Sequence, residues 1–437
     1  MSCREIRFRL LAPLLAILAL LPLQAREGPW PEAPNRFELD NGLAVICFVD
    51  SNSSNSVVQI LVNGGQRLEA PGKQGLTYLT ISLALKVSER VDVRYLMEMG
   101  SDYNLSVFPD YALVTVQCQS VFLERTLEIL AKQMADPLLT GIRINAVKTR
   151  LKNLQKQEQD QPLEAMRLAQ RQAFFSGSAS AGSVFGSAAS LDAVGKKDIS
   201  TLHRALFSSK NLKLLVTSDL HVVAIKEILA KTCGHFPSGP PAVAPIVSPV
   251  SGPFSPQKIK LQTIQALLST AFRLPPVCRE NIIPGTLLEA LLGKGVDSRL
   301  WALRSRHDLA YSFDADFTAF KQGSLLSVHL KTDLARLNEA KAFLDAIFAD
   351  LRGNGIRAPE FAAAQANAGM EFLKSGESKK QFSALAAHLE GMGLGAGYIA
   401  EYTSQLQAMT LDEFNRYLNL VLQSANRFDV VVGPGTD

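Results

Sequence analysis

The chain has few residues of the kinds that hold metal ions or form disulfide bonds. Its 437 residues include five cysteines and six histidines, with neither a CxxC pair nor two histidines three to five residues apart. This spacing excludes a zinc ribbon, a redox dithiol and a helix that grips a catalytic zinc ion with two imidazoles. The cysteines beyond residue 25 lie mostly in apolar, strand-like segments and are expected to be buried free thiols; they are Cys47, Cys118, Cys233 and Cys278.

Sequence signatures of a self-contained catalytic site are also missing. A GxSxG nucleophile elbow, a Walker loop and a GxGxxG turn after a strand do not occur. Lysine and arginine exceed aspartate and glutamate by only 45 to 41, which is too slight an excess for a nucleic-acid partner. Hydrophobic residues make up 47% of the chain and charged residues 20%, so we expect a folded protein with a substantial core.

The N-terminus has the pattern of a secretory signal peptide. Arg4, Arg7 and Arg9 precede an apolar run over 10–23, which ends shortly before Ala25. A basic start, a short apolar segment and a small residue before the cleavage point predict a signal peptide over residues 1–25, with an uncleaved membrane anchor as the alternative. The expected product is a secreted or periplasmic chain without membrane contact after cleavage, because no later segment reaches the ~18 apolar residues of a span.

A proline-rich stretch divides the chain into two halves of similar size. Seven prolines fall within 235–257, and such a segment cannot form a helix or a central strand. We therefore expect an N-terminal domain over 26–234, an extended linker over 235–257 and a C-terminal domain over 258–437.

The two halves repeat one order of elements. Each half contains two strand-like segments, an apolar helix, two further strands, an amphipathic helix, a run of helices and a final strand. This order predicts an α+β protein with two homologous repeats, each a sandwich of a mixed or antiparallel sheet with helices packed on one face. The expected strands are 42–50, 57–65, 102–108, 111–119 and 212–218 in the first half, and 258–263, 266–274, 310–319, 324–332 and 428–433 in the second.

The segment 64–85 (GGQRLEAPGKQGLTYLTISLAL) resembles the N-terminal signature of the insulinase/pitrilysin metallopeptidases, or inverzincins. In that family a glycine-leucine step enters a helix carrying HxxEH. Alignment on this step puts Tyr78, Ile81 and Ser82 at the positions of the first His, the catalytic Glu and the second His. The resemblance therefore implies a degenerate metal site without zinc. Because residues three and four apart share one side of a helix, all three side chains are expected to face the cleft between the halves.

The third zinc ligand of the family is a glutamate on a later helix. Its counterpart here lies within 152–160. A match to the Asp160-x-Pro162 step puts Leu154 at that position, whereas spacing alone favours Glu158. In either alignment, one carboxylate cannot replace two imidazoles as zinc donors.

The segment 287–317 resembles the C-terminal repeat of the same family, with a glycine-containing loop, a Ser-Arg-Leu helix and an LAYS segment. Arg304 and Tyr311 match the Arg/Tyr pair that reaches the substrate near the scissile bond. A guanidinium and a phenol can both donate hydrogen bonds to an oxygen as negative charge develops on it, so the resemblance implies a supporting catalytic role. An exposed helix cation and a core aromatic residue are the alternative. The loop residues implied to contact substrate are Gly293, Gly295 and Ser298.

The segment 99–116 is similar to the family's strand pair whose edge strand lines the cleft. Asn104 and Leu105 occupy the position of its Asn-Ala step. A peptide can add itself to such an edge by main-chain pairing, so the resemblance implies that these two residues bind substrate. An ordinary hairpin edge is the alternative.

The resemblance implies one function, and a second stays open. Short members of the family build a clam-like chamber from two subunits, and in some heterodimers one subunit supplies HxxEH and the other supplies Arg/Tyr. This chain would then be the catalytically incomplete subunit, with zinc only in an HxxEH partner and unstructured peptides as substrates. The alternative is a non-enzymatic scaffold or peptide-binding protein of the same fold. The sequence identifies neither the partner nor the substrates.

Overall fold

The computed structural model describes residues 31, 33–245 and 254–434, and the chain from Pro31 onward forms one compact unit. The expected signal peptide over 1–25 lies outside the described residues. Within the described ranges, no helix has both the length and the apolar character that crossing a membrane requires.

The first half forms a six-stranded sheet with the strand order β1-β2-β6-β3-β5-β4. Only β2 and β6 run parallel, and the other pairs are antiparallel. The strands are β1 (Asn35–Glu38), β2 (Ala44–Val49), β3 (Asn55–Asn63), β4 (Asp102–Val107), β5 (Tyr111–Gln119) and β6 (Leu212–Ser218). The helices are α1 (Leu76–Ala84), α2 (Arg90–Glu98), α3 (Leu123–Ala135), α4 (Gly141–Asp160), α5 (Pro162–Phe174), α6 (Ala188–Ala193), α7 (Lys196–Leu206) and α8 (Val222–Cys233).

The second half forms a five-stranded sheet with the order β7-β11-β8-β10-β9. It repeats the strand order of the first sheet from β2 to β4, including one parallel pair, β7 with β11. Among the described residues of this half, no strand corresponds to β1. The strands are β7 (Gln257–Lys260), β8 (Ala266–Leu274), β9 (Ser312–Thr318), β10 (Ser324–Thr332) and β11 (Arg427–Gly433). The helices are α9 (Ile282–Gly293), α10 (Trp301–Ser305), α11 (Leu337–Asn354), α12 (Ala358–Lys374), α13 (Lys379–Met392), α14 (Tyr398–Ala408) and α15 (Leu411–Val421). The predicted α+β architecture of two repeats is confirmed.

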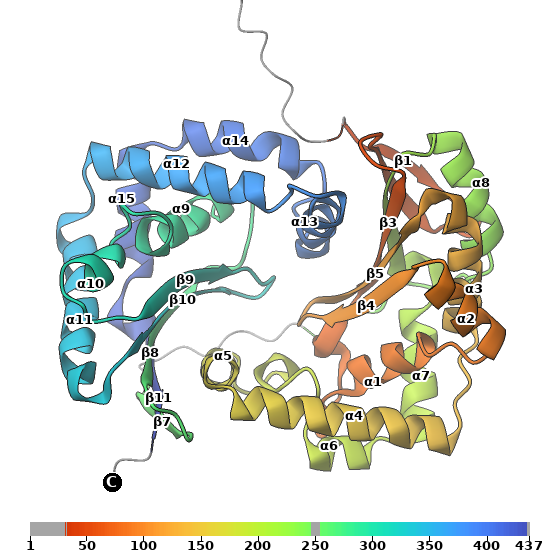
Figure 1. Ribbon diagram of the computed structural model, residues 1–437, viewed down its shortest axis with the longest axis horizontal. Helices are drawn as coiled ribbons and strands as arrows, with labels where there is room; N and C mark the ends of the chain where they lie inside the picture. Colours follow the sequence, from red (N-terminus) through yellow and green to blue (C-terminus); the bar gives the residue numbers. More distant parts are fainter. Residues whose placement is uncertain (1–30, 32, 246–253, 435–437) are drawn as a thin grey trace, which may run out of the picture. The chain divides into compact units, whose positions relative to one another are not determined.

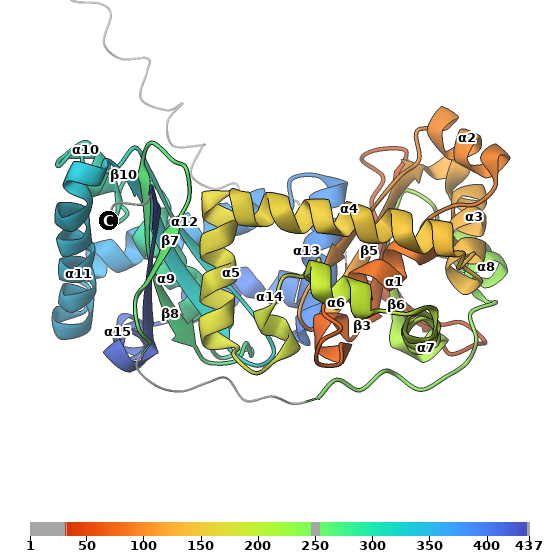
Figure 2. The same cartoon turned by 90° about the horizontal axis from the view of Figure 1, so that it is seen from below.

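One helix of each half packs against the sheet of the other half, as Figures 1 and 2 show. The helix α13 of the second half covers the first sheet, and the helix α5 of the first half covers the second sheet. Successive side chains of a strand point to opposite faces of a sheet. In the first sheet, Cys47 of β2 packs with that half's own helices, whereas the next residue, Phe48, contacts Phe382 of α13 at a ring-centroid distance of 4.9 Å. In the second sheet, Phe272 of β8 contacts Phe348 of α11, at 4.8 Å, and the opposite face is covered by α5.

The apolar face of α5 is part of the core of the second half. The first-half side chains in this cluster pack against residues of β8, β10 and β11, and they include Met166, Ala169, Phe174 and Phe175. The expectation of helices on one face of each sheet is therefore incomplete, because an exchanged helix covers the second face. The expected linker at 235–257 lies in the sequence between the strands of the first sheet and those of the second. It does not divide the helices in the same way, because α5 and α13 each pack on the sheet that lies on the other side of the linker in the sequence.

The cysteines follow the expectation with one exception. Cys47, Cys118 and Cys233 are buried and free, and burial raises the pKa of each thiol to about 11. Cys278 is exposed, so the expectation of a buried thiol is wrong there. This residue lies in the connection before α9 and not inside a strand, which removes the physical reason for its burial.

Candidate functional site

The start of α1 is fixed by a buried carboxylate. Glu69 accepts hydrogen bonds from the backbone amides of Gly75 at 3.0 Å and Thr77 at 2.9 Å. These amides lack helical partners at a helix N-terminus. Gly75 has a φ of +87°, and a Cβ there would lie 2.6 Å from the carbonyl oxygen of Phe185. Burial raises the pKa of Glu69 to about 8, although both amides and Arg171 oppose this shift.

The three residues at the metal-binding positions of α1 do not form a polar cluster. Tyr78 is half-buried, and its ring lies 5.1 Å from that of Phe185. Ser82 is also half-buried. Ile81 is fully buried in the core of the first half, so the expectation that all three face a cleft is wrong for Ile81. An apolar side chain at this position is stabilised by burial among its neighbours, which a catalytic carboxylate would not be.

These residues do not fit a zinc ion. Zinc in proteins takes thiolate, imidazole and carboxylate donors, and Tyr78 and Ser82, at the positions of the two histidines, offer only hydroxyl groups. Among the residues that the structure describes, no three His, Cys, Asp or Glu side chains are grouped so that they could hold a metal ion. The two candidates for the third ligand, Leu154 and Glu158, both lie on α4. Leu154 packs against the first-half core, and Glu158 lines a pocket described below.

The predicted edge strand lies at a sheet edge. β4 is the last strand of the first sheet and pairs only with β5 within the described sheet, where Asn104 lies opposite Thr115 and Leu105 opposite Val114. Asn104 is exposed, whereas Leu105 packs against the core. The outer side of β4 therefore offers main-chain groups to which an extended peptide could add.

Arg304 and Tyr311 are both exposed. Arg304 lies near the end of α10, with its guanidinium 5.9 Å from the ring centre of Trp301. Tyr311 directly precedes β9, its backbone amide donates to the carbonyl oxygen of Lys331, and its side chain is 66% exposed. Tyr311 is therefore not a core aromatic residue, which was the alternative interpretation of its position in the sequence. Neither residue lines the pocket described below, so in this chain alone both face solvent.

The glycine-containing loop packs tightly against β9 and α12. A Cβ at Gly293 would lie 2.6 Å from the backbone nitrogen of Ala315, and one at Gly295 would lie 2.7 Å from the side chain of Asn367. Ser298 is buried, and its hydroxyl donates to the carbonyl oxygen of Gly295 at 2.8 Å. The expected role of the three residues in substrate binding is untested, and their contacts here shape the loop.

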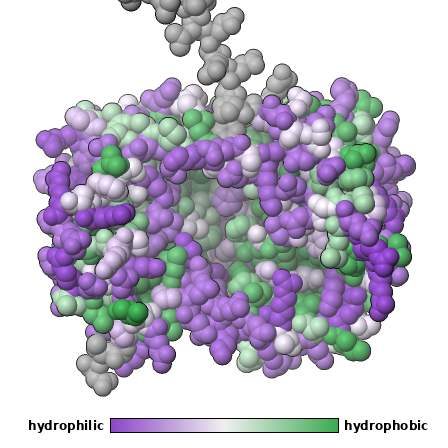
Figure 3. Space-filling model, viewed as in Figure 1, coloured by the Kyte–Doolittle hydropathy of each residue, from purple (hydrophilic) through white to green (hydrophobic). Residues whose placement is uncertain are grey.

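A pocket of about 200 Å³ lies where the two halves meet, and no sequence motif predicted it. It is bounded by the β4–β5 hairpin, the end of α4, the helix α5 and the strands β9 and β10. Its charged lining residues are Glu158, Glu164, Arg167, Arg171 and Asp316, and its other lining residues are Val107, Phe108, Pro109, Leu168, Gln170, Val184, Thr318, Phe320, Leu325 and Ser327. The face drawn in Figure 3 is hollowed near its middle, with hydrophilic side chains around much of the opening.

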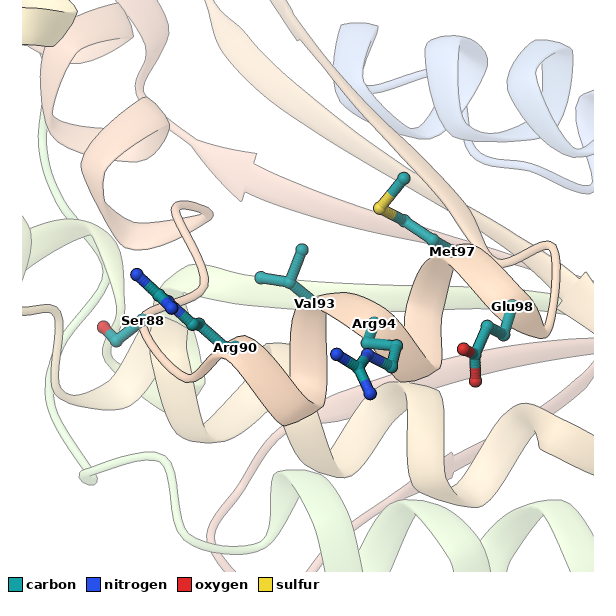
Figure 4. A pocket seen from close by; sticks show the side chains of 6 residues that line it. All are labelled: Ser88, Arg90, Val93, Arg94, Met97 and Glu98. Atoms are coloured by element: carbon teal, nitrogen blue, oxygen red, sulfur yellow. The ribbon is translucent and has the colours of Figure 1, made fainter.

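A second depression runs along α2 (Figure 4). Its volume is about 370 Å³, and it is lined by Ser88, Arg90, Val93, Arg94, Met97 and Glu98. Leu96 is the only buried residue of α2, and the side chains of Val91 and Met97 are each 76% exposed. Few side chains of the helix therefore pack on the first half, and Val91 and Met97 face solvent.

Family models match both halves of the chain. Residues 45–184 match the model described as Insulinase (Peptidase family M16), and residues 193–368 match the model described as Peptidase M16 inactive domain. No curated protein matched the chain.

Solved structures share the fold at low sequence identity. A peptidase M16 inactive domain from Pseudomonas fluorescens is 18% identical, with a TM-score of 0.82 over 92% of this chain and 98% of that one. A protease from Helicobacter pylori is 17% identical, with a TM-score of 0.84 over 93% and 100%. A putative M16-like peptidase from Alicyclobacillus acidocaldarius is 15% identical, with a TM-score of 0.81 over 92% and 98%.

Proposed function

The chain belongs to peptidase family M16, and we propose that it is the zinc-free subunit of a secreted or periplasmic peptidase of this family. In this proposal an HxxEH-containing homologue binds the zinc ion, and the present chain supplies Arg304 and Tyr311 to the shared site. The two chains form a heterodimer that cleaves unstructured peptides.

The contrast between the two halves carries the proposal. Ile81 occupies the position of the catalytic glutamate and is fully buried, whereas Arg304 and Tyr311 retain the family's pair and are exposed. A tyrosine ring that served only its own chain would gain by burial against neighbours, and that of Tyr311 is exposed. The guanidinium of Arg304 and the hydroxyl of Tyr311 are exposed hydrogen-bond donors, and the described part of this chain has no zinc site beside which they could act. They are therefore suited to the catalytic site of a second subunit.

The chemistry of the pair suits a peptide bond under attack. When a nucleophile adds to a carbonyl carbon, negative charge develops on the carbonyl oxygen. The guanidinium of Arg304 and the phenol of Tyr311 each donate hydrogen bonds and can stabilise that charge. The outer side of β4 supports the same proposal, because an extended peptide can pair with its backbone.

The test uses a complex of this chain with an HxxEH-containing homologue of similar length from the same cells. Arg304→Ala and Tyr311→Phe should leave assembly intact and lower turnover about a hundredfold or more, with less change in KM, because one oxyanion donor contributes roughly 3–4 kcal/mol in the transition state. The matched control is Arg306→Ala, a second exposed arginine on the same segment.

Two results would overturn the proposal. Equal turnover of the wild-type complex and the doubly substituted complex would make Arg304 and Tyr311 ordinary surface residues. Stable assembly with that result would favour the scaffold function. Failure of the two chains to co-purify from cells that express both would show that they form no stable heterodimer.

A further inference from the structure

The connection between Arg304 and Tyr311 contains a residue in a left-handed conformation. Of the non-glycine residues that the structure describes, only Asp308 has a positive φ, at +49°. This conformation brings the Cβ of an L-amino acid close to the following carbonyl oxygen, which costs free energy. It persists where the surrounding structure holds it in place. Contacts around this turn must therefore stabilise it.

The chain that leaves the turn is fixed by backbone hydrogen bonds. The amide of Leu309 donates to the carbonyl oxygen of Leu303 at 2.8 Å, and the amide of Tyr311 donates to that of Lys331 at 3.0 Å. The side chains of Leu309 and Ala310 are buried. The carbonyl oxygens of the turn itself, at positions 307 and 308, accept from no backbone amide of the described residues.

The side chain of Arg336 donates to both of these oxygens. Its Nη1 donates to the carbonyl oxygen of Asp308 at 2.6 Å, and its Nη2 donates to that of His307 at 3.0 Å. The carboxylate of Glu339 accepts from Nε and Nη2 of the same guanidinium at 3.1 and 3.2 Å. A guanidinium has five N–H groups in a fixed planar arrangement, and these contacts use four of them. Glu339 therefore orients the arginine, and the arginine holds the turn.

The turn is thereby attached to the start of α11. Arg336 directly precedes this helix, and the ring of His307 lies 4.7 Å from that of Phe343, which belongs to it. The helix is itself anchored by buried side chains such as Ala340 and Leu344. Figures 1 and 2 both show α10, which carries Arg304, beside α11. The geometry of the connection thus depends on an element that contains neither of the two donors.

We propose that Arg336 is a positioning residue for Arg304 and Tyr311. With Glu339 it holds the left-handed turn at Asp308 and so fixes how the two donors lie relative to each other. Small displacements of groups that act on a transition state lower the rate, even when the displaced groups remain present. This inference deepens the proposed function and rests on it for the statement that the two donors act on a peptide bond. The hold on the turn is a property of the isolated chain.

The first test measures amide hydrogen exchange of the isolated chain by mass spectrometry, over fragments that cover 303–311. Arg336→Ala should speed exchange in these fragments about tenfold, because the turn loses two hydrogen bonds and opens more often. The matched control is Arg352→Ala, an exposed arginine in the last turn of α11, which should leave these fragments unchanged. Wild-type exchange in Arg336→Ala would overturn the inference.

A second variant keeps the test decisive if Arg336→Ala does not fold. Glu339→Gln retains the size of the side chain and removes the charge that orients the guanidinium, and this side chain is exposed. Exchange over the same fragments should rise by a smaller factor than in Arg336→Ala. In the absence of a folded Arg336→Ala protein, wild-type exchange in Glu339→Gln would overturn the inference.

The second test measures turnover by the complex with the HxxEH homologue. Arg336→Ala should lower kcat about tenfold with little change in KM, because a displaced donor weakens an interaction made in the transition state. Arg336→Lys retains the charge without the planar set of donors, so its kcat should lie between those of Arg336→Ala and the wild type. Arg352→Ala should have wild-type turnover.

A double-mutant cycle separates positioning from a general effect on stability. In a complex that already carries Arg304→Ala and Tyr311→Phe, Arg336→Ala should cause little further loss, because a residue that acts through this pair has nothing left to position. A further loss as large as in the wild-type background would overturn the inference.

Failure of this inference is distinguishable from failure of the proposed function. Full turnover of the complex that carries Arg304→Ala and Tyr311→Phe would contradict the proposed function itself. Slow turnover of that complex, together with unchanged turnover of the Arg336→Ala complex, would contradict only the positioning role of Arg336.

Discussion

Lys379 Nζ donates a hydrogen bond of 2.8 Å to the carbonyl oxygen of Asn55, although 324 positions separate the two residues. The same ammonium group donates to the carbonyl oxygens of Asp50 and Ser53 at 2.8 and 2.7 Å. Lys379 is buried, and burial lowers its pKa, although Asp50 and Asp219 oppose the shift. One side chain at the start of α13 thus satisfies two backbone groups between β2 and β3 of the other half and one at the first residue of β3.

Replacement of this ammonium group should destabilise the protein. We expect Lys379→Met to lower the free energy of unfolding by about 2 kcal/mol or more, because three carbonyl oxygens lose their donor. The measurement is equilibrium denaturation in urea. Lys374→Met removes an exposed lysine that pairs with Glu371 and should cost less than about 1 kcal/mol. Equal losses for both variants would contradict the importance of this contact.

His388 should make stability depend on pH. Its side chain is hydrogen-bonded to the hydroxyl of Tyr111 across the two halves, and burial lowers its pKa from 6.5 to about 4. Between these values the unfolded chain binds the proton and the folded chain does not, so protons favour unfolding. Stability should therefore fall as pH drops from about 6.5 to about 4, by up to ~3 kcal/mol from this group.

Unfolding curves at several pH values would measure this effect. The comparison is with His388→Gln, whose side chain does not titrate in this range. The difference in stability between the two proteins should narrow as pH falls toward about 4. A difference that stays constant from pH 6.5 to 4 would show that another group carries the dependence.

The isolated chain should bind no zinc stoichiometrically. Tyr78, Ile81 and Ser82 provide neither two imidazoles nor a carboxylate at the family's metal positions. Metal analysis after purification should find far less than one zinc ion per chain, whereas an HxxEH homologue purified in parallel should retain its metal. A tightly held ion at unit stoichiometry, or chelator-sensitive peptide hydrolysis by the isolated chain, would refute this.

Restoring a glutamate at position 81 of α1 should lower the free energy of unfolding. Ile81 is fully buried, so Ile81→Glu places a carboxylate in the core without a partner and should cost about 3 kcal/mol or more. Ile81→Val, which removes one methylene group, should cost only about 0.5–1.5 kcal/mol. Thermal or urea unfolding measures both. A stable Ile81→Glu protein would mean that α1 can still turn this position toward solvent.

The sheets of this protein could be predicted closely from the sequence because their strands are long and apolar. The segments 111–119, 212–218, 266–274 and 324–332 were expected as strands and are strands over the same residues. The two proline-separated repeats also followed from the order of elements. Hydrophobic periodicity indicates which face of a helix or strand is buried, and it can be recognised from neighbouring residues alone.

What the sequence did not predict depends on contacts between distant segments. The apolar side of a helix does not specify which sheet it covers, so the placement of α5 and α13 on the opposite halves was not foreseen. The pocket with Glu158 and Gln170 was missed for the same reason, since its walls come together only through this exchange. The helix α2 was not among the expected elements, and its burial is slight, since only Leu96 of this helix is buried.

The exchange of α5 and α13 makes the order of synthesis matter. The strands of the first sheet end at Ser218, but the helix that covers their second face ends at Met392. A nascent chain that stops between these points exposes one apolar face of a finished sheet, with Phe48 among its side chains. The first sheet therefore cannot be covered on both faces until α13 has been synthesised, so its folding is completed only with the second half.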